Sequence, residues 1–377
     1  MKTRVLFMYG GNSVEHEISI LTALQAMENI DSSKYEAIPC YVSKQGDFYT
    51  GEELFHLENY RDLERLCRGM KPVHIERKRG QPMLLRSGWS LFALPFDVVL
   101  PLMHGINGED GSAAGFCRMM QLPFCESDIL SAALGQDKGM QKKVLQQEGF
   151  LISAYEELHA GQKKEEWITR LKRLHYPLIV KPAMLGSSIG IEKANDEESC
   201  IEAVQRAFAY GERVIVEECV QNLRELNCSI LHTPYGYRSS AVEEVSPQGG
   251  LYDYDEKYLN GNLKQSGPCS RIWLRDEQLV SEVQHQSLQI AKLLQTKGVI
   301  RIDFLYDEGE KKLYVNEMNT IPGSLSYYLW EWEGVGFAQL LDLIIQDGIT
   351  AYQQRSRCLS SYSTNVLQMT KLYGHKK

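Results

Sequence analysis

Short apolar runs and amphipathic segments alternate along the first part of the chain. Arg4 to Tyr9 and Asp97 to Leu102 are compact apolar runs, which predict buried strands. Tyr35 to Tyr49 predicts further strand structure around a Gln45-Gly46 turn, and Leu54 to Arg68 predicts an amphipathic helix. This alternation of strands and helices predicts an open α/β sheet at the front of the chain.

From residue 128 onward the pattern becomes richer in strands. Asp128 to Gly149 and Asp276 to Gln295 have the apolar spacing of helices. Tyr176 to Ile191 predicts two strands joined by a loop, Arg213 to Val220 predicts one buried strand, and Arg301 to Gly323 predicts a hairpin. We therefore expect an antiparallel, β-rich middle followed by an α+β segment, with no internal repeat.

The hairpin carries polar side chains at alternate positions. Arg301 and Asp303 share one face of its first strand, and Glu317 and Asn319 share one face of its second strand. If these faces coincide, their oxygens suit Mg²⁺ held by one or two carboxylates together with substrate phosphates. The alternative is an ordinary solvated face of a hairpin.

Glycines accompany polar side chains after two of the predicted strands. Gly10 and Gly11 precede a helix that Ser13 could cap, with Glu15 in its first turn. Such a turn lets backbone amides approach a ligand, although the acids could simply complement the helix dipole. His104 ends the second strand before a Gly-Glu-Asp-Gly loop, where it is either a binding or a structural histidine.

Lys181 and the loop from Gly186 to Gly190 have the composition of a phosphate site, although the spacing is not that of a P-loop. A plain hairpin with a Gly-Ser turn is the alternative. Glu217 and Glu218 end a buried strand, where acids can accept hydrogen bonds from a ribose. The polar stretch from Tyr252 to Tyr258 predicts a mobile lid.

Composition narrows the class of protein. The 377 residues are 43% hydrophobic and 24% charged, which is typical of a soluble globular protein with two or three domains. The net charge of −8 and the lack of a long basic run argue against nucleic acid as a partner. No apolar run is long enough to span a membrane, and the nine cysteines have no metal-binding spacing. We expect a cytoplasmic protein with reduced thiols.

Seven motifs occur in order along roughly residues 1 to 350. They are Gly10-Gly-x-Ser-x-Glu-His-Glu-x-Ser19, His104-Gly-x-x-Gly-Glu-Asp-Gly111, Asp137-Lys138, Val180-Lys-Pro-x-x-x-Gly-Ser-Ser-x-Gly190, Tyr252-Asp-Tyr-x-x-Lys-Tyr258, Arg301-x-Asp303 and Asn316-Glu-x-Asn-Thr-x-Pro-Gly323. Taken together, they resemble the motifs of the D-alanine–D-alanine ligases, which are ATP-grasp enzymes of bacterial peptidoglycan precursor synthesis.

The resemblance implies a three-domain ATP-grasp architecture of α/β and α+β parts with an N-terminal open α/β domain. We expect an N-terminal substrate domain over residues 1–126, a central domain over 127–218 and a C-terminal domain with lid and metal site over 219–377. The family transfers the γ-phosphate of ATP to the carboxylate of a first D-alanine. The amine of a second D-alanine then attacks this acyl phosphate. A homodimer, two Mg²⁺ and the possible use of Mn²⁺ are also implied.

The resemblance implies a role for each matching residue. Lys138 and Lys181 would hold the ATP phosphates, Ser188 would also bind the nucleotide, and Lys257 would accompany Tyr258 on the lid. The acids Glu217, Glu218 and Glu225 would meet adenine and ribose, and Asp303, Glu317 and Asn319 would bind the two metals. Glu15 would hold the first substrate's ammonium through a network with Ser187 and Tyr258, and Arg301 with the Gly323 amide would stabilise the oxyanion. His104, Ser324 and Tyr328 would contact substrate.

Three positions depart from the family's pattern. Tyr328 stands where a serine usually helps to bind the second substrate, Ala114 replaces a usual glutamine, and Cys125-Glu126 replaces a usual small pair. The retained Lys257-Tyr258 favours D-alanine over D-lactate as the acceptor. We therefore expect a D-alanine–D-alanine ligase. A related ligase with D-serine or another amino acid as acceptor is the main alternative, and a non-catalytic nucleotide-binding protein is a third.

Overall fold

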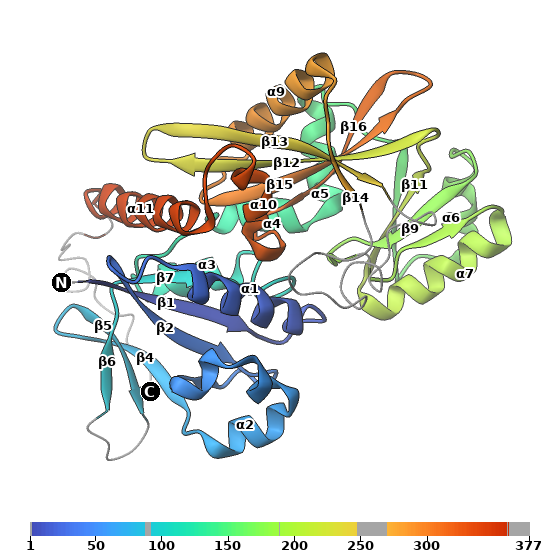
Figure 1. Ribbon diagram of the computed structural model, residues 1–377. Coiled ribbons are helices and arrows are strands. Elements are labelled where there is room, and N and C mark those ends of the chain that lie inside the picture. Colours follow the sequence, from blue (N-terminus) through green and yellow to red (C-terminus); the bar gives the residue numbers. More distant parts are fainter. Residues whose placement is uncertain (1, 87–91, 188, 247–269, 360, 362–377) are drawn as a thin grey trace, which may run out of the picture.

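The computed structural model describes residues 2–86, 92–187, 189–246, 270–359 and 361. Their strands form three sheets of seven, four and five strands. Figure 1 shows the seven-stranded sheet below the five-stranded sheet, with the four-stranded sheet and its helices beside them. This mixed arrangement agrees with the α/β and α+β fold expected from the sequence.

The first sheet has the strand order β6-β5-β4-β3-β2-β1-β7. Its parallel centre consists of β2 (Tyr35–Val42), β1 (Thr3–Gly10) and β7 (Val98–Pro101). The antiparallel edge adds β3 (Phe48–Tyr49), β4 (Val73–Lys78), β5 (Gln81–Arg86) and β6 (Ala93–Pro95). Helix α1 (His16–Asn29) follows β1, and α3 (Ser112–Met119) follows the loop after β7.

The second sheet has the order β10-β9-β11-β8, with antiparallel neighbours throughout. Its strands are β8 (Tyr155–His159), β9 (Leu178–Pro182), β10 (Glu192–Ala194) and β11 (Arg213–Glu218). Helices α6 (Lys164–Leu171) and α7 (Glu197–Ala207) cover one face, where Val180, Val214 and Val216 are fully buried. Because side chains alternate along a strand, Lys181 and Glu217 project from the other face.

The third sheet has the order β14-β13-β12-β15-β16. Its strands are β12 (Leu223–Thr233), β13 (Gly236–Ser246), β14 (Ser270–Trp273), β15 (Val299–Asp307) and β16 (Lys312–Asn319). Helix α9 (Glu277–Leu293) lies along one face and shares a core with Leu226, Ile302 and Phe304 (Figure 1). The alternate residues of β12 and β15 therefore point away from α9.

The C-terminal helices tie the third sheet to the first. Helix α11 (Phe337–Ser356) shares its core cluster with β1 and β7, and the fully buried Trp330 of α10 (Tyr327–Glu331) belongs to the same cluster. The single-turn helix η4 (Gly323–Ser326) precedes α10 and packs against α1. The chain after the predicted hairpin therefore returns directly to the first sheet.

Two predicted helices differ from the structure. Leu54 to Arg68 is not one helix but two single-turn helices, η1 (Glu52–Phe55) and η2 (Leu57–Arg61), followed by α2 (Leu63–Gly69). Its buried residues Leu54, Tyr60 and Leu66 recur every six positions, which does not fit one face of an α-helix. Asp128 to Gly149 is divided into α4 (Ile129–Gln136) and α5 (Lys138–Gln147), because Asp137 leaves the helical conformation and caps α5.

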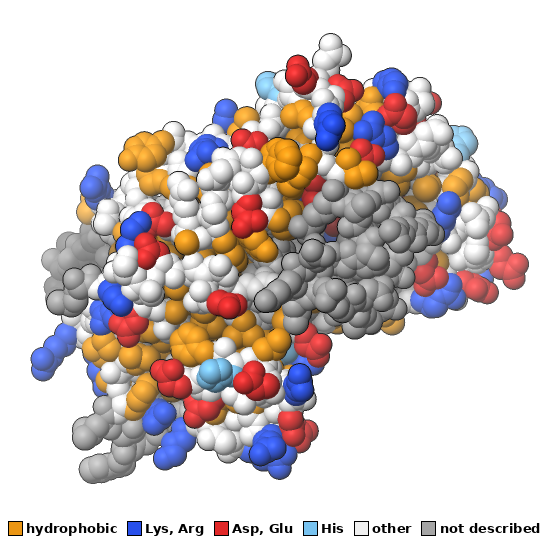
Figure 2. All heavy atoms as spheres, in the orientation of Figure 1, with side chains coloured by type: hydrophobic (Ala, Val, Ile, Leu, Met, Phe, Trp, Pro, Cys, Tyr) orange, Lys and Arg blue, Asp and Glu red, His pale blue; other side chains and the backbone are white. Residues whose placement is uncertain are grey.

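The described cysteines are all free thiols. No helix within the described ranges is both long and apolar enough to cross a membrane. Acidic and basic side chains are interspersed on the face shown in Figure 2, in keeping with the absence of a long basic run in the sequence.

Candidate active site

The predicted hairpin forms with the register that its pattern required. Arg301 pairs with Asn319, and Asp303 pairs with Glu317, across β15 and β16. On the other side of β15, Asp303 pairs with Asn227 of β12, which in turn pairs with Glu243 of β13. Since directly paired residues share a face, one row of polar side chains crosses four strands on the face away from α9.

Arg301 and Asp303 form a two-pronged ion pair within this face. The Arg301 Nε lies 2.6 Å from Asp303 Oδ1, and Nη2 lies 2.7 Å from Oδ2. Asn319 Nδ2 also donates to Asp303 Oδ2, at 3.0 Å. Burial acts against the charged guanidinium, but Asp303, Tyr328 and Glu243 together raise the pKa of Arg301 well above its usual value. Arg301 is therefore a permanent cation at the centre of the row.

Lys138 reaches the hairpin from the first residue of α5. Its buried Nζ lies 3.0 Å from Glu317 Oε2 and donates to the Leu185 carbonyl at 2.6 Å. Burial works against the ammonium, but the charges of Glu317 and Glu15 raise the pKa of Lys138. The backbone N–H of Lys138 donates to the Ala183 carbonyl. One residue thus joins the loop after β9 to β16.

Lys181 and Glu217 form the corresponding centre on the second sheet. The Lys181 ammonium pairs with Glu217 Oε1 and donates to Asn316 Oδ1 at 3.1 Å. Lys142 Nζ lies 2.7 Å from Glu217 Oε2, and all three charged side chains are buried. Although burial acts in the opposite direction, the two lysines lower the pKa of Glu217 to about 2. Because Asn316 precedes Glu317, the two sheets meet at this point.

Glu15 and Ser187 come together from opposite ends of the site. The Ser187 hydroxyl donates to Glu15 Oε1, and Glu15 is buried at the start of α1. A side chain at Gly105 would lie 2.6 Å from the Glu15 carboxylate, so glycine is required for this close approach. Ser13 does not cap α1 as expected, because its hydroxyl instead accepts from the Glu15 N–H at 3.1 Å.

His104 is buried beside this carboxylate group. Its Nε2 lies 3.0 Å from the Thr22 hydroxyl, and burial together with the charge of Arg301 lowers the pKa of His104 to about 4. Glu109 accepts from the Gly105 and Ile321 N–H groups at 2.9 and 3.0 Å. Burial and the charge of Glu15 raise the pKa of Glu109 to about 8. Both side chains are thus held mainly in their neutral forms near pH 7.

The segment after the hairpin turns sharply through left-handed backbone. Ser324, Leu325 and Ser326 have φ angles of 51°, 52° and 48°. Ser324 Oγ donates to Gln25 Oε1 of α1 at 2.6 Å, and Ser324 N donates to the Thr22 hydroxyl at 3.2 Å. After this strained turn, α10 packs against β12 and β13, and the Tyr328 hydroxyl donates to Glu243 Oε1 at 3.2 Å.

The two remaining acidic candidates lie on different surfaces. Glu225 is on the polar face of the third sheet, since it pairs with Leu305, two residues beyond Asp303. Glu218 projects away from Glu217 and accepts from the His175 N–H and Nδ1 at 2.9 and 2.8 Å. Ser188, Lys257 and Tyr258, and with them the predicted lid, lie outside the described residues.

Comparison with known proteins places this arrangement in one family. Residues 4–127 match the family model for the D-ala D-ala ligase N-terminus, and residues 144–346 match the model for its C-terminus. The D-alanine–D-alanine ligase of Thermosipho melanesiensis is 35% identical over 96% of this chain and 97% of its own length. This chain belongs to the D-alanine–D-alanine ligase family. The activity expected from the motifs, that of a ligase joining two D-alanines, is confirmed at the level of this family.

Solved structures agree with this assignment. The D-alanine–D-alanine ligase of Coxiella burnetii is 25% identical, with a TM-score of 0.79 over 98% of this chain and 99% of that one. The D-Ala:D-Ser ligase of Enterococcus faecalis is 27% identical, with a TM-score of 0.77 over 92% of this chain and 100% of that one. The ATP-grasp architecture predicted from the sequence is therefore confirmed.

For a member of this ligase family, the hairpin face is a suitable place for Mg²⁺. Asp303 and Glu317 present two carboxylates, and Asn319 adds an amide, on adjacent strands. Among the described residues no group of three or more His, Cys, Asp or Glu side chains could hold a metal. Magnesium commonly takes one or two protein carboxylates and completes its shell with phosphates and water. The residues present fit that mode, and their roles stay predictions.

Four residues of the ligase site were not identified from the sequence. Lys142 and Glu109 are buried ionisable residues that lie close to the predicted ones. Asn227 and Glu243 extend the polar row across β12 and β13. The Gly-Glu-Asp-Gly loop did point to the region of Glu109. Glu243 lies beside Glu244 within an apolar run, so the sequence alone gives no signal for which carboxylate faces the site.

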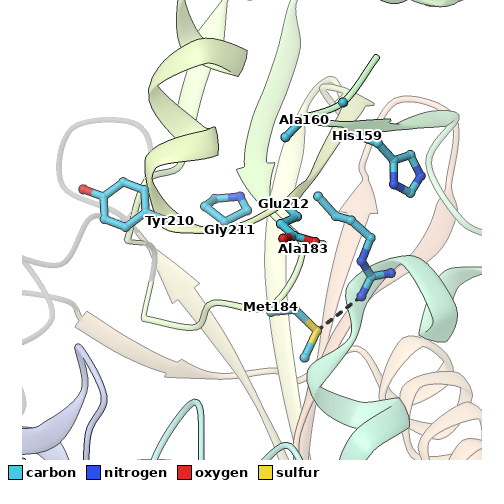
Figure 3. A pocket seen from close by; sticks show the side chains of 10 residues that line it. His159, Ala160, Ala183, Met184, Tyr210, Gly211 and Glu212 are labelled. Atoms are coloured by element: carbon cyan, nitrogen blue, oxygen red, sulfur yellow. Dashed lines mark hydrogen bonds between the residues drawn. The ribbon is translucent and has the colours of Figure 1, made fainter.

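A separate cavity of about 590 Å³ lies at one end of the second sheet, where β8 and β9 end and β11 begins (Figure 3). It is lined by His159, Ala160, Gly161, Pro182, Ala183, Met184, Tyr210, Gly211, Glu212 and Arg213. Arg213 Nη2 lies 3.5 Å from Met184 Sδ, and the same guanidinium pairs with Asp137 and Glu157. The cavity contains none of the predicted site residues.

Proposed function

We propose that the polar face of the third sheet, together with Lys138 and Lys181, carries out the ligation of two D-alanines with ATP. The observation that carries this proposal is the convergence of both lysines on the hairpin segment: Lys138 pairs with Glu317, and Lys181 donates to the neighbouring Asn316. Phosphoryl transfer needs positioned cations around the phosphates and little covalent chemistry from the protein. The site supplies such cations from helix α5 and from β9 of the second sheet.

In the first step, the carboxylate of one D-alanine attacks the γ-phosphorus of ATP, giving an acyl phosphate and ADP. Glu15, held by Ser187, would bind the ammonium of this D-alanine. Lys138 and Lys181 would hold the phosphates. Two Mg²⁺ bound through Asp303, Glu317 and Asn319 would neutralise the phosphate charge. Mn²⁺ is a chemically similar substitute at such an oxygen site.

In the second step, the ammonium of the other D-alanine loses a proton, and the resulting amine attacks the acyl carbonyl. The nitrogen loses a further proton as the amide forms. Arg301 and the Gly323 N–H would stabilise the oxyanion of the tetrahedral intermediate, which then expels phosphate. Glu217, Glu218 and Glu225 remain proposals for the adenosine contacts. Of these, Glu217 and Glu225 have support from their position on the faces that carry Lys181 and Asp303. Glu218 has less support, because its carboxylate is engaged by His175 on the opposite face.

The domain boundaries, assembly and location are further parts of the proposal. Strands β1–β7 fall within residues 1–126, β8–β11 within 127–218, and β12–β16 within 219–377, which supports the three predicted domains. We infer a homodimer from the family resemblance, and light scattering on the purified protein tests it. A cytoplasmic location is inferred from the use of ATP, and fractionation of the source cells tests it.

An amino-acid panel tests the proposed reaction. Purified protein with ATP and Mg²⁺ should release phosphate with D-alanine and yield a product with the mass of D-alanyl-D-alanine, which supplies peptidoglycan precursors. L-alanine serves as the matched control and should give no product. D-serine belongs in the panel because one structural relative is a D-Ala:D-Ser ligase. Absence of phosphate release with every amino acid in the panel would refute the ligase proposal.

A further inference from the structure

A buried carboxylate stands on the acceptor side of Arg301. Glu243 of β13 is only 2% exposed, and it lies in the same row as Asp303, beyond Asn227. Neighbouring strands are about 4.8 Å apart, so the backbones of Glu243 and Asp303 are separated by about two such steps. The row therefore has the hairpin with the proposed metal ligands at one end and Glu243 at the other.

Two hydrogen-bond donors hold this carboxylate in place. Asn227 Nδ2 lies 3.2 Å from Glu243 Oε1, and the Tyr328 hydroxyl lies 3.2 Å from the same oxygen. Both donors therefore fix the position of Glu243 Oε1. Tyr328 occupies the position expected to contact the second substrate, so Glu243 lies where that substrate would enter.

The opposite charges of Glu243 and Arg301 suit a zwitterion. A free amino acid presents an ammonium and a carboxylate a few ångströms apart, and a site for it benefits from one anion and one cation at similar spacing. The charge of Glu243 contributes to the raised pKa of Arg301, which indicates that the two groups interact across the face. An acceptor with a hydroxyl in place of the ammonium could not form an ion pair with Glu243.

We propose that Glu243 binds the ammonium of the acceptor D-alanine and thereby selects an amino acid over a 2-hydroxy acid. This inference rests on the proposed ligase reaction and adds a specificity-determining residue to it. Asn227 and Tyr328 act as positioning residues for the carboxylate. The neighbouring Glu244 takes no part, because it points to the other face, where both its oxygens pair with Arg224 at 2.8–2.9 Å.

A competition experiment tests this role. Wild type, Glu243→Gln and the matched control Glu244→Gln are given ATP, Mg²⁺ and equal D-alanine and D-lactate, and the ratio of dipeptide to depsipeptide is measured by mass. Glu243→Gln should shift this ratio toward depsipeptide by at least about tenfold. The reason is that removing one partner of a buried charge pair typically weakens binding by more than tenfold. Glu244→Gln should keep the wild-type ratio. The KM for ATP should stay unchanged in both variants.

Each outcome bears on the inference. Glu243→Asp keeps the charge, so its ratio should stay near the wild-type value even if Glu243→Gln makes no product. An unchanged ratio in Glu243→Gln, or an equal shift in Glu243→Asp and Glu243→Gln, would overturn the role of the charge. A shift as large in Glu244→Gln would also overturn it. A wild type that makes dipeptide separates these results from failure of the ligase proposal, whereas a wild type that makes no dipeptide refutes both.

Discussion

Asp303 and Glu317 lie directly opposite each other on β15 and β16, and each carboxylate is paired with a different cation. Asp303 is held by Arg301 of its own strand, whereas Glu317 is held by Lys138 from α5. The two carboxylates therefore share one face of the hairpin but belong to two separate charge pairs. This arrangement links the proposed metal site both to the arginine proposed to stabilise the oxyanion and to the lysine proposed to bind phosphate.

Replacement of Glu317 by alanine should abolish turnover. Mutation of a residue that only hydrogen-bonds to a metal ligand typically lowers metal affinity or activity by about 10- to 100-fold. Loss of a ligand itself should therefore lower kcat/KM by at least about 100-fold. Phosphate release at several Mg²⁺ concentrations measures the effect. Glu310→Ala at the exposed hairpin turn is the matched control and should behave like wild type. Full activity in Glu317→Ala would remove Glu317 from the metal site.

Ser187→Ala should weaken binding of the first D-alanine. The Ser187 hydroxyl orients Glu15, and a hydrogen bond to a charged group contributes about 1.5–3 kcal/mol, equivalent to roughly 10- to 100-fold. We expect KM for the first D-alanine to rise by this factor while KM for ATP changes little. Steady-state kinetics over a range of D-alanine concentrations provides the measurement. A rise confined to KM for ATP would instead place Ser187 at the nucleotide.

Glu217→Gln should destabilise the protein at neutral pH. The variant leaves the buried Lys142 and Lys181 without their shared carboxylate, and breaking such a buried pair costs about 3–5 kcal/mol. Urea unfolding at pH 7 measures the loss in free energy of unfolding. The exposed Glu202→Gln on α7 is the control and should change stability little.

The lowered pKa of Glu217 also predicts how the stability of the protein depends on pH. The pKa of Glu217 is about 2 in the folded protein, below the usual 4.5, so its stabilising contribution is complete above about pH 5. It is lost as the pH falls from about 4.5 toward 2. The difference in stability between wild type and Glu217→Gln should therefore shrink in that range. A constant difference down to pH 2.5 would contradict the assigned ion pairs.

Tyr328→Ser should act mainly on the acceptor. The shorter side chain loses the hydrogen bond to Glu243 and opens space beside Arg301. We expect KM for the second D-alanine to change by about tenfold, with ATP binding preserved. Product analysis with D-alanine and D-serine shows whether the preferred acceptor also changes. If only ATP affinity moves, Tyr328 does not lie at the acceptor.

The parts of the site that lie close together in the sequence were the parts that the sequence predicted. Alternation along Arg301–Asp303 and Glu317–Asn319 specified their faces, because strand pairing in a short hairpin follows from a turn of a few residues. The motifs identified Lys138, Lys181 and Glu15 as further candidates. They did not predict how far these residues lie from the hairpin. The structure brings these residues together, while Ser188, Lys257 and Tyr258 lie outside its described part.

The errors and omissions have physical causes. The residues from Leu54 to Arg68 have good helix-forming composition, but burial of Leu54 and Tyr60 against the first sheet imposes single turns instead. Glu243 was missed because its place in the site depends on pairing with Asn227, 16 residues away, and on Tyr328, 85 residues away. Tertiary pairing of this kind leaves no periodic signal in either segment.

The charge pairs at this site also predict how its ligands influence one another. Lys138, which we propose binds phosphate, is paired with Glu317, which we propose binds Mg²⁺. Binding of either ligand must therefore break this ion pair. Phosphate that engages Lys138 releases Glu317 for the metal, and metal that engages Glu317 releases Lys138 for phosphate. By thermodynamic reciprocity, each ligand then raises the affinity for the other by the same factor. If both proposed roles hold, the ion pair predicts that nucleotide and metal bind with positive cooperativity.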